Sequence, residues 1–129
     1  INVELVNQDW KVYLSREMIG DFQVSRAGWI GDYEDPNTFL DTMRPNRGNN
    51  KTRWDNYEFD DLLAKANATL DQEERYKILM EAERLLIDEM PIAPIYTYVR
   101  VYQLHEDVKG WHPNILSHHH PKYIRIERD

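Results

Sequence analysis

The chain contains no cysteine, no excess of basic charge and no long apolar run. Because it has no thiol, disulfide bonds and thiolate metal sites are excluded. No apolar stretch approaches the roughly 20 residues that a membrane-spanning helix needs, so no such helix is expected. The 16 lysines and arginines are outnumbered by 23 acidic residues, which gives a net charge of −7. A nucleic-acid surface needs a basic patch, and we therefore expect no nucleic-acid partner.

Motifs of phosphate binding and of nucleophilic catalysis are also missing. No glycine-rich phosphate loop occurs, and Ser25 lacks the G-x-S-x-G surroundings of a hydrolase nucleophile. What the sequence does contain is 41% apolar residues in 129, which is typical of one globular domain rather than a disordered chain.

The N-terminal third follows a strand, helix, strand pattern. Ile1–Val6 alternates apolar and polar residues, and residues 22–30 form a second strand pattern. Between them lies a helical stripe, and Gly20 is a natural C-terminal cap. This spacing predicts a βαβ unit with two parallel strands. The stripe consists of Trp10, Tyr13, Leu14 and Met18.

Three helices and a long strand are predicted after the polar loop that begins at Asp32. A short helix is expected around residues 39–43, and a capping pair, Asp71 with Glu74, begins a later helix that Pro91 ends. Residues 92–104 and 123–126 alternate as strands do. The fold class is α/β, a mixed sheet with packed helices. The two long helices carry the stripes Phe59, Leu62, Leu63, Ala66 and Leu70, and Tyr76, Leu79, Met80, Leu86, Ile87 and Met90.

The segment from Val24 to Tyr33 is the most informative for function. In a regular strand Arg26 would share a face with apolar residues, and a buried guanidinium requires a carboxylate from the protein or from a ligand. Trp29 and Asp32 follow at the carboxyl end of this strand, where ligands gather in α/β proteins. Two interpretations remain open, a ligand site or a core tryptophan beside a structural Arg–Asp pair.

A series of short motifs in a fixed order carries a family resemblance. They are Arg26-Ala27-Gly28-Trp29, Asp32-Tyr33, Pro36, Phe39-Leu40, Phe59-Asp60, Ala82-Glu83, Pro94-Ile95-Tyr96-Thr97-Tyr98-Val99 and Val108-Lys109-Gly110-Trp111. This order resembles the C-terminal part of the bacterial extracellular solute-binding proteins of family 5, the oligopeptide- and dipeptide-binding proteins of ABC importers. The resemblance implies part of one lobe of a two-lobed periplasmic-binding-protein-like fold. Residues 1–104 would belong to the C-terminal ligand-binding lobe, and residues 105–129 would be a return segment toward the other lobe.

The resemblance also implies how a ligand is bound. Two lobes would close over an extended peptide, which hydrogen-bonds to protein backbone as an added strand. Asp32 would take the α-ammonium, Trp29 would wall a side-chain pocket, Tyr98 would line the cleft, and Arg26 would lie near the ligand or hold the acidic end of the site. The implied ligand-binding residues are Arg26, Ala27, Gly28, Trp29, Ile30, Asp32 and Tyr98.

The family implies partners and a location as well. The partners would be a peptide and the membrane-embedded subunits of an ABC importer, with no cofactor, at the periplasmic or cell-surface side of the cytoplasmic membrane. One residue departs from the pattern. Glu17, next to Arg16, stands where some relatives have an arginine that can meet a peptide's C-terminal carboxylate. A fixed peptide length is therefore not implied.

Two other functions compete with peptide binding. The first is a hydrolase or metal-dependent enzyme that uses the acidic loop 32–35 and the histidines 118–120. Adjacent residues of an extended chain point to opposite sides, so three consecutive histidines do not form a closed metal site by themselves. The second alternative is the same scaffold with a non-peptide solute. We expect a binding module with no metal and no enzymatic activity.

The start of the chain suggests a fragment. It opens inside a strand pattern, without an initiator methionine or a signal peptide. The alternative is a complete small domain with trimmed ends. For a fragment, uncovered strand edges at residues 1–6 and 123–126 predict self-association.

Overall fold

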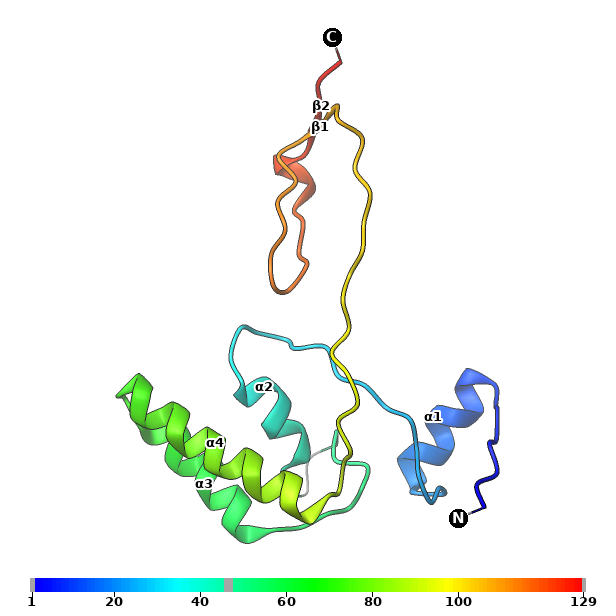
Figure 1. Cartoon of the computed structure of the whole chain (residues 1–129), viewed down its shortest axis with the longest axis vertical. Coiled ribbons are helices and arrows are strands. Elements are labelled where there is room, and N and C mark those ends of the chain that lie inside the picture. Colours follow the sequence, from blue (N-terminus) through cyan, green and yellow to red (C-terminus); the bar gives the residue numbers. More distant parts are fainter. Residues whose placement is uncertain (1, 46–47, 129) are drawn as a thin grey trace.

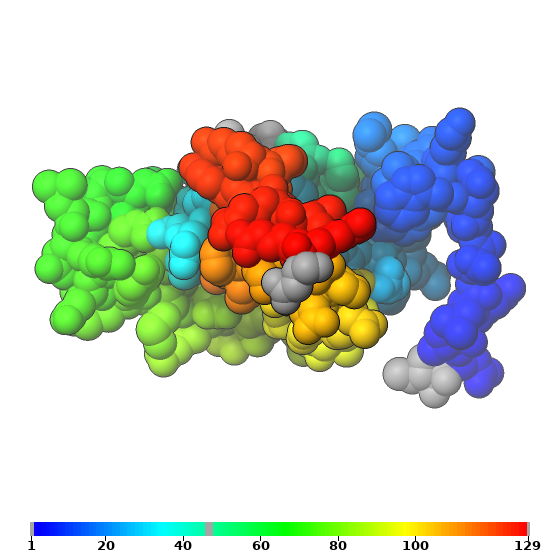
Figure 2. All heavy atoms as spheres, turned by 90° about the horizontal axis from the view of Figure 1, so that it is seen from above, coloured from blue at the N-terminus to red at the C-terminus, as the bar shows by residue number. Residues whose placement is uncertain are grey.

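The chain forms three bodies joined by long extended segments. The computed structural model describes residues 2–45 and 48–128. Helix α1 (Trp10–Ile19) lies to one side. Helices α2 (Asn37–Leu40), α3 (Tyr57–Ala68) and α4 (Gln72–Glu89) form a helical body. A small hairpin module, which contains β1 (Val108–Lys109) and β2 (Arg125–Ile126), stands at the far end (Figure 1). Seen from above, α1 and the α3–α4 pair lie at opposite ends, with the C-terminal segment between them (Figure 2).

The core lies entirely in the helical body. Helices α3 and α4 pack side by side as a hairpin, and α2 with the 3-10 turn η1 (Asp41–Met43) covers them. Phe59 is fully buried, and Trp54 packs edge-on against it with ring centroids 4.9 Å apart. The buried apolar residues are Leu40, Met43, Phe59, Leu63, Ala66, Ile78, Leu79, Ala82 and Leu86.

Local side-chain chemistry sets the helix ends as predicted. The Asp71 carboxylate accepts a hydrogen bond of 2.8 Å from the Glu74 N–H at the start of α4. Gly20 closes α1 in the left-handed conformation, with φ of 75°. Helix α4 stops at Glu89, ahead of Pro91. The prediction was wrong for Leu70, which is fully exposed because α3 ends at Ala68.

The predicted parallel strands do not form a ladder in this chain. Residues 25–30 and 93–104 are extended but unpaired (Figure 1), and so are residues 2–6, whereas the chain bends at Gln23 and Val24. Ile1 of the predicted first strand lies outside the described residues. Within residues 2–45 and 48–128, the only ladder joins β1 (Val108–Lys109) to β2 (Arg125–Ile126), antiparallel. A strand needs a neighbour to accept its backbone hydrogen bonds. No described segment lies in register beside segment 22–30 or segment 92–104, so neither forms a ladder.

The same segments keep their apolar side chains in solvent. Val101 is 93% exposed, and Ile95 and Val99 on the same row are nearly as open. The packed sheet face predicted for this row is therefore not covered by the described residues.

None of the helices in the described part of the chain combines the length and the apolar character needed to cross a bilayer.

The hairpin module is held by aromatic stacking and by one glycine. Tyr102 packs on Trp111, and Trp111 stacks on His119 with ring centroids 4.0 Å apart. A Cβ at Gly110 would lie 1.8 Å from the Tyr123 carbonyl oxygen, so the turn beside β1 requires glycine. The 3-10 turn η2 (Pro121–Tyr123) leads into β2.

Candidate ligand-binding site

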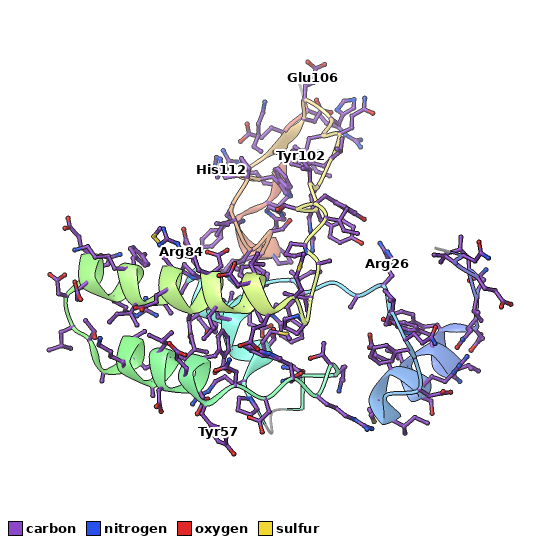
Figure 3. The ribbon with its side chains drawn as sticks, turned by 60° about the horizontal axis from the view of Figure 1, so that its bottom comes forward. Arg26, Tyr57, Arg84, Tyr102, Glu106 and His112 are labelled. Atoms are coloured by element: carbon purple, nitrogen blue, oxygen red, sulfur yellow. The ribbon has the colours of Figure 1, made fainter. Side chains whose placement is uncertain are left out.

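Two extended segments, 22–30 and 92–104, approach each other at Arg26. The Arg26 guanidinium donates hydrogen bonds to the phenol oxygens of Tyr96, at 3.3 Å, and Tyr98. A Cβ at Gly28 would lie 3.5 Å from the Tyr98 ring, so the backbone of one segment passes close to an aromatic ring of the other. Arg26 lies on the thin extended connection between α1 and the helical body (Figure 3).

Arg26 is not buried and, among the residues that the structure describes, has no acidic partner. Its side chain is exposed, and it forms no ion pair with any residue in the described part of the chain. The described residues therefore form no structural Arg–Asp pair at Arg26. The hydrogen bond with Tyr96 raises the pKa of the Arg26 guanidinium above its ordinary value. Two phenols accept hydrogen bonds without neutralising the charge, so a full positive charge stays available at this point.

The two extended segments cross where Arg26 meets Tyr96 and Tyr98, and these two tyrosines form the aromatic half of this crossing. Their ring centroids are 5.0 Å apart and their planes meet at 69°, an edge-to-face arrangement. Hydrogen bonds from Tyr98 and then from Arg26 lower the pKa of Tyr96, whereas the hydrogen bond with Tyr96 raises the pKa of Tyr98. Tyr98 was among the predicted site residues, and Tyr96 was missed. The period-2 alternation, which places both on one face, could have found it.

Helix α1 supports the segment that carries Arg26. The Tyr13 phenol oxygen lies 2.7 Å from a Glu17 carboxylate oxygen and 2.9 Å from the Arg26 carbonyl oxygen. The Ser25 hydroxyl also donates to Glu17, at 3.3 Å. Burial, followed by the Glu17 carboxylate, raises the pKa of Tyr13. Glu17, the departure from the family pattern, therefore helps to hold segment 22–30 against α1.

Asp32 presents an exposed carboxylate on a constrained backbone. Its N–H donates a hydrogen bond of 3.0 Å to the Thr38 hydroxyl, and Thr38 is only 4% exposed. Three residues further on, Asp35 accepts two hydrogen bonds from Arg75 of α4, at 2.6 and 2.8 Å. The loop between segment 22–30 and α2 is thus fastened to the helical body at both residues.

The structure brings together some of the predicted site residues and separates others. Arg26, Gly28 and Tyr98 meet at the crossing, whereas Asp32 lies further along the chain against α2. Within the described residues, no hydrogen bond or ion pair links Asp32 to Arg26 or Tyr98. Trp29 is 39% exposed, so it is not the core residue that one interpretation required. Ala27 and Ile30 are exposed as well.

Two residues of the rival enzyme hypothesis, Asp35 and His119, make contacts with other side chains. Asp35 pairs with Arg75, and that hydrogen-bonded pair lowers the pKa of the Asp35 carboxyl. His119 stacks on Trp111 and lies 3.4 Å from the Ser117 hydroxyl. Across residues 2–45 and 48–128, no group of three or more His, Asp or Glu side chains is arranged to hold a metal ion.

Comparison with known proteins finds relatives along nearly the whole chain. The oligopeptide-binding protein OppA of Bacillus subtilis is 43% identical over 111 residues, which are 85% of this chain and 20% of that protein. No family model matches the chain. Among solved structures, OppA of Burkholderia pseudomallei superposes with a TM-score of 0.86 at 28% identity, over 97% of this chain and 25% of its own. The murein tripeptide-binding protein MppA of Escherichia coli gives 0.84 at 31% identity, over 99% and 25%.

The extent of these matches explains the extended segments. The chain spans about a fifth to a quarter of the length of these relatives. High TM-scores over almost all of the chain mean that its backbone, unpaired segments included, follows the path of the matching part of larger proteins. The prediction of part of one lobe is confirmed by this likeness.

Proposed function

We propose, from the premise that the chain belongs to the bacterial peptide-binding proteins of solute-binding family 5, that it forms part of a ligand-binding lobe that captures extended peptides. The observation that carries this proposal is the match to peptide-binding proteins over most of the chain. Residues 1–104 would belong to the lobe, and residues 105–129 would return toward the other lobe.

Unpaired backbone near the crossing suits a peptide ligand. Residues 27–30 are exposed and belong to no ladder, so their N–H and C=O groups can pair with a peptide main chain as a neighbouring strand would. Such bonds use atoms that every peptide has, which makes binding tolerant of peptide sequence. Trp29 would then form the wall of a side-chain pocket, and Tyr98 would line the cleft.

Charges of both signs are available for the ends of a peptide. Asp32 has an exposed carboxylate that can take an α-ammonium, and Arg26 has an exposed guanidinium that no described carboxylate pairs with. We assign Asp32 to the ammonium and place Arg26 near the ligand. Both groups are exposed in this structure, and a closing lobe that excludes water from them would strengthen their interaction with a charged ligand.

A binding role is favoured over catalysis. The Asp35 carboxylate is already paired with Arg75, so it is not available as a free catalytic acid or base, and the ring face of His119 packs on Trp111. The relatives named above are binding proteins, and one of them, MppA of Escherichia coli, carries "periplasmic" in its name. The whole protein would therefore act outside the cytoplasmic membrane and deliver its ligand to an ABC importer. A non-peptide solute is the second candidate on the same scaffold.

Calorimetry on Asp32 variants of the full-length protein tests the assignment. Removing one partner of a buried charge pair typically costs about 3–5 kcal/mol, so Asp32→Ala should weaken binding of a short peptide at least tenfold. The melting temperature should change little because the Asp32 carboxylate is exposed without ligand. Asp61→Ala on α3, which also removes an exposed acid, is the matched control and should bind as the wild type does. Unchanged affinity of Asp32→Ala would remove Asp32 from the site.

A further inference from the structure

The Thr38 side chain is the contact between the Asp32 loop and α2. Its hydroxyl accepts the hydrogen bond from the Asp32 N–H, at 3.0 Å. Its methyl group faces Gly31, where an added Cβ would lie 3.1 Å from the Thr38 Cγ2 atom. A side chain that is 4% exposed thus contacts two consecutive backbone positions, one of which carries the exposed carboxylate.

Asp35 and Arg75 close the same loop from the other side. The Asp35 carbonyl accepts from the Thr38 N–H at 3.1 Å, and its carboxylate accepts from the Asn37 N–H at 2.9 Å. That carboxylate also receives both hydrogen bonds from Arg75, whose helix contributes buried residues to the core. The turn from Asp32 to Thr38 is therefore tied to α4, the longest helix of the chain.

These contacts hold the backbone of Asp32 and do not involve its carboxylate. Within the described residues, the Asp32 side chain forms no hydrogen bond or ion pair, so its position depends on the backbone that carries it. A charged group that is fixed before the ligand arrives loses less entropy on binding than a mobile one. A carboxylate on a free loop would have to be ordered by each ligand.

We propose that Thr38, backed by the Asp35–Arg75 pair, is a positioning residue that aims the Asp32 carboxylate at the free amino group of a bound ligand. The proposal rests on the function proposed above and goes further by naming what makes the site select a free α-ammonium. Thr38 touches no ligand in this account. Its effect should therefore appear only with ligands that use Asp32.

The test compares a tripeptide with its N-acetylated form, using calorimetry on the full-length protein. Thr38→Val keeps the shape and removes the acceptor, which should lower affinity for the free tripeptide about tenfold. The affinity of Thr38→Val for the acetylated form, which lacks the ammonium, should equal the affinity of the wild type for that form. Thr38→Ser restores the hydroxyl and should bind the free tripeptide within about threefold of wild type. Thr42→Val removes a hydroxyl that donates to the Phe39 carbonyl, at 2.6 Å, away from Asp32, and should change neither affinity.

A second variant keeps the test decisive if Thr38→Val does not fold. Arg75→Met releases Asp35 from α4 and should reproduce the selective loss, whereas Lys77→Met on the exposed side of α4 should not. Equal losses for the free and acetylated tripeptides, or no loss in either variant, would overturn the positioning role. If Asp32→Ala also leaves the affinity for the free tripeptide unchanged, the assignment of Asp32 to the ammonium fails. If the wild-type protein binds neither tripeptide, the proposed function itself fails, so these failures are distinguishable from the failure of the positioning role.

Discussion

Arg26 and Tyr98 lie 72 residues apart in the chain, yet the guanidinium of one donates a hydrogen bond to the phenol of the other. The guanidinium also lies over the Tyr98 ring, 6.0 Å from its centroid. This relationship joins the two extended segments, neither of which belongs to a ladder. Among the described residues no backbone hydrogen bond joins the two segments, and side chains make the contact at the place where the binding site is proposed.

The helical body should carry most of the stability of this part of the protein. Phe59 is fully buried against Trp54, so Phe59→Ala should cost about 3–5 kcal/mol in the free energy of unfolding. Leu70→Ala, at a fully exposed position just beyond α3, should stay within about 0.5 kcal/mol of wild type. Urea denaturation followed by far-ultraviolet circular dichroism measures both. Equal losses would mean that the core lies elsewhere.

Acid should break the link between the Asp32 loop and α4. Arg75 lowers the pKa of the Asp35 carboxyl below its unfolded value of about 4, so the pair contributes fully to stability above that pH. The contribution is lost as the pH falls through the lower, folded-state pKa. With side chains about one-fifth exposed, the pair should be worth roughly 1–2 kcal/mol.

The pH dependence is measured as a difference between two proteins. At pH 6 the full-length Arg75→Met variant should be less stable than wild type, and the gap should close as the pH drops below about 4. A gap that persists unchanged into strong acid would show that Arg75 stabilises by packing, not through Asp35.

The 129-residue chain by itself should associate. It leaves the apolar side chains of Val24, Ile95, Val99 and Val101 in solvent, on extended segments with unpaired backbone groups. Such edges pair with other chains. Light scattering at several concentrations should give a mass above the monomer that grows with concentration. A strictly monomeric mass with a cooperative melt would contradict this.

The parts of the fold that depend on neighbours in the sequence were predictable. The Asp71 cap, the Gly20 cap and the end of α4 before Pro91 each follow from chemistry within a few residues. The pairing of the segment 22–30 was not predictable, because a strand pattern specifies an extended backbone but not the partner that satisfies it. Here no described segment supplies that partner.

In the candidate site, too, the local motifs were predictable and the long-range contacts were not. Motifs along the chain pointed to Arg26, Asp32 and Tyr98, but not to the residues that hold them. Thr38 and Arg75 carry no motif, and Arg75 meets Asp35 across 40 residues of sequence only because α4 folds back beside α2. Contacts of this kind depend on tertiary packing, which periodicity and local propensity do not encode.

The most direct test of the central claim is to identify what the full-length protein holds when it is purified without added ligand. Mass spectrometry of the small molecules released on denaturation should find peptides of varied sequence with free amino termini. The same peptides, incubated with the protein, should be recovered intact. Recovery of a single non-peptide solute in place of peptides, or time-dependent cleavage that Glu34→Gln or His119→Ala abolishes, would contradict the account.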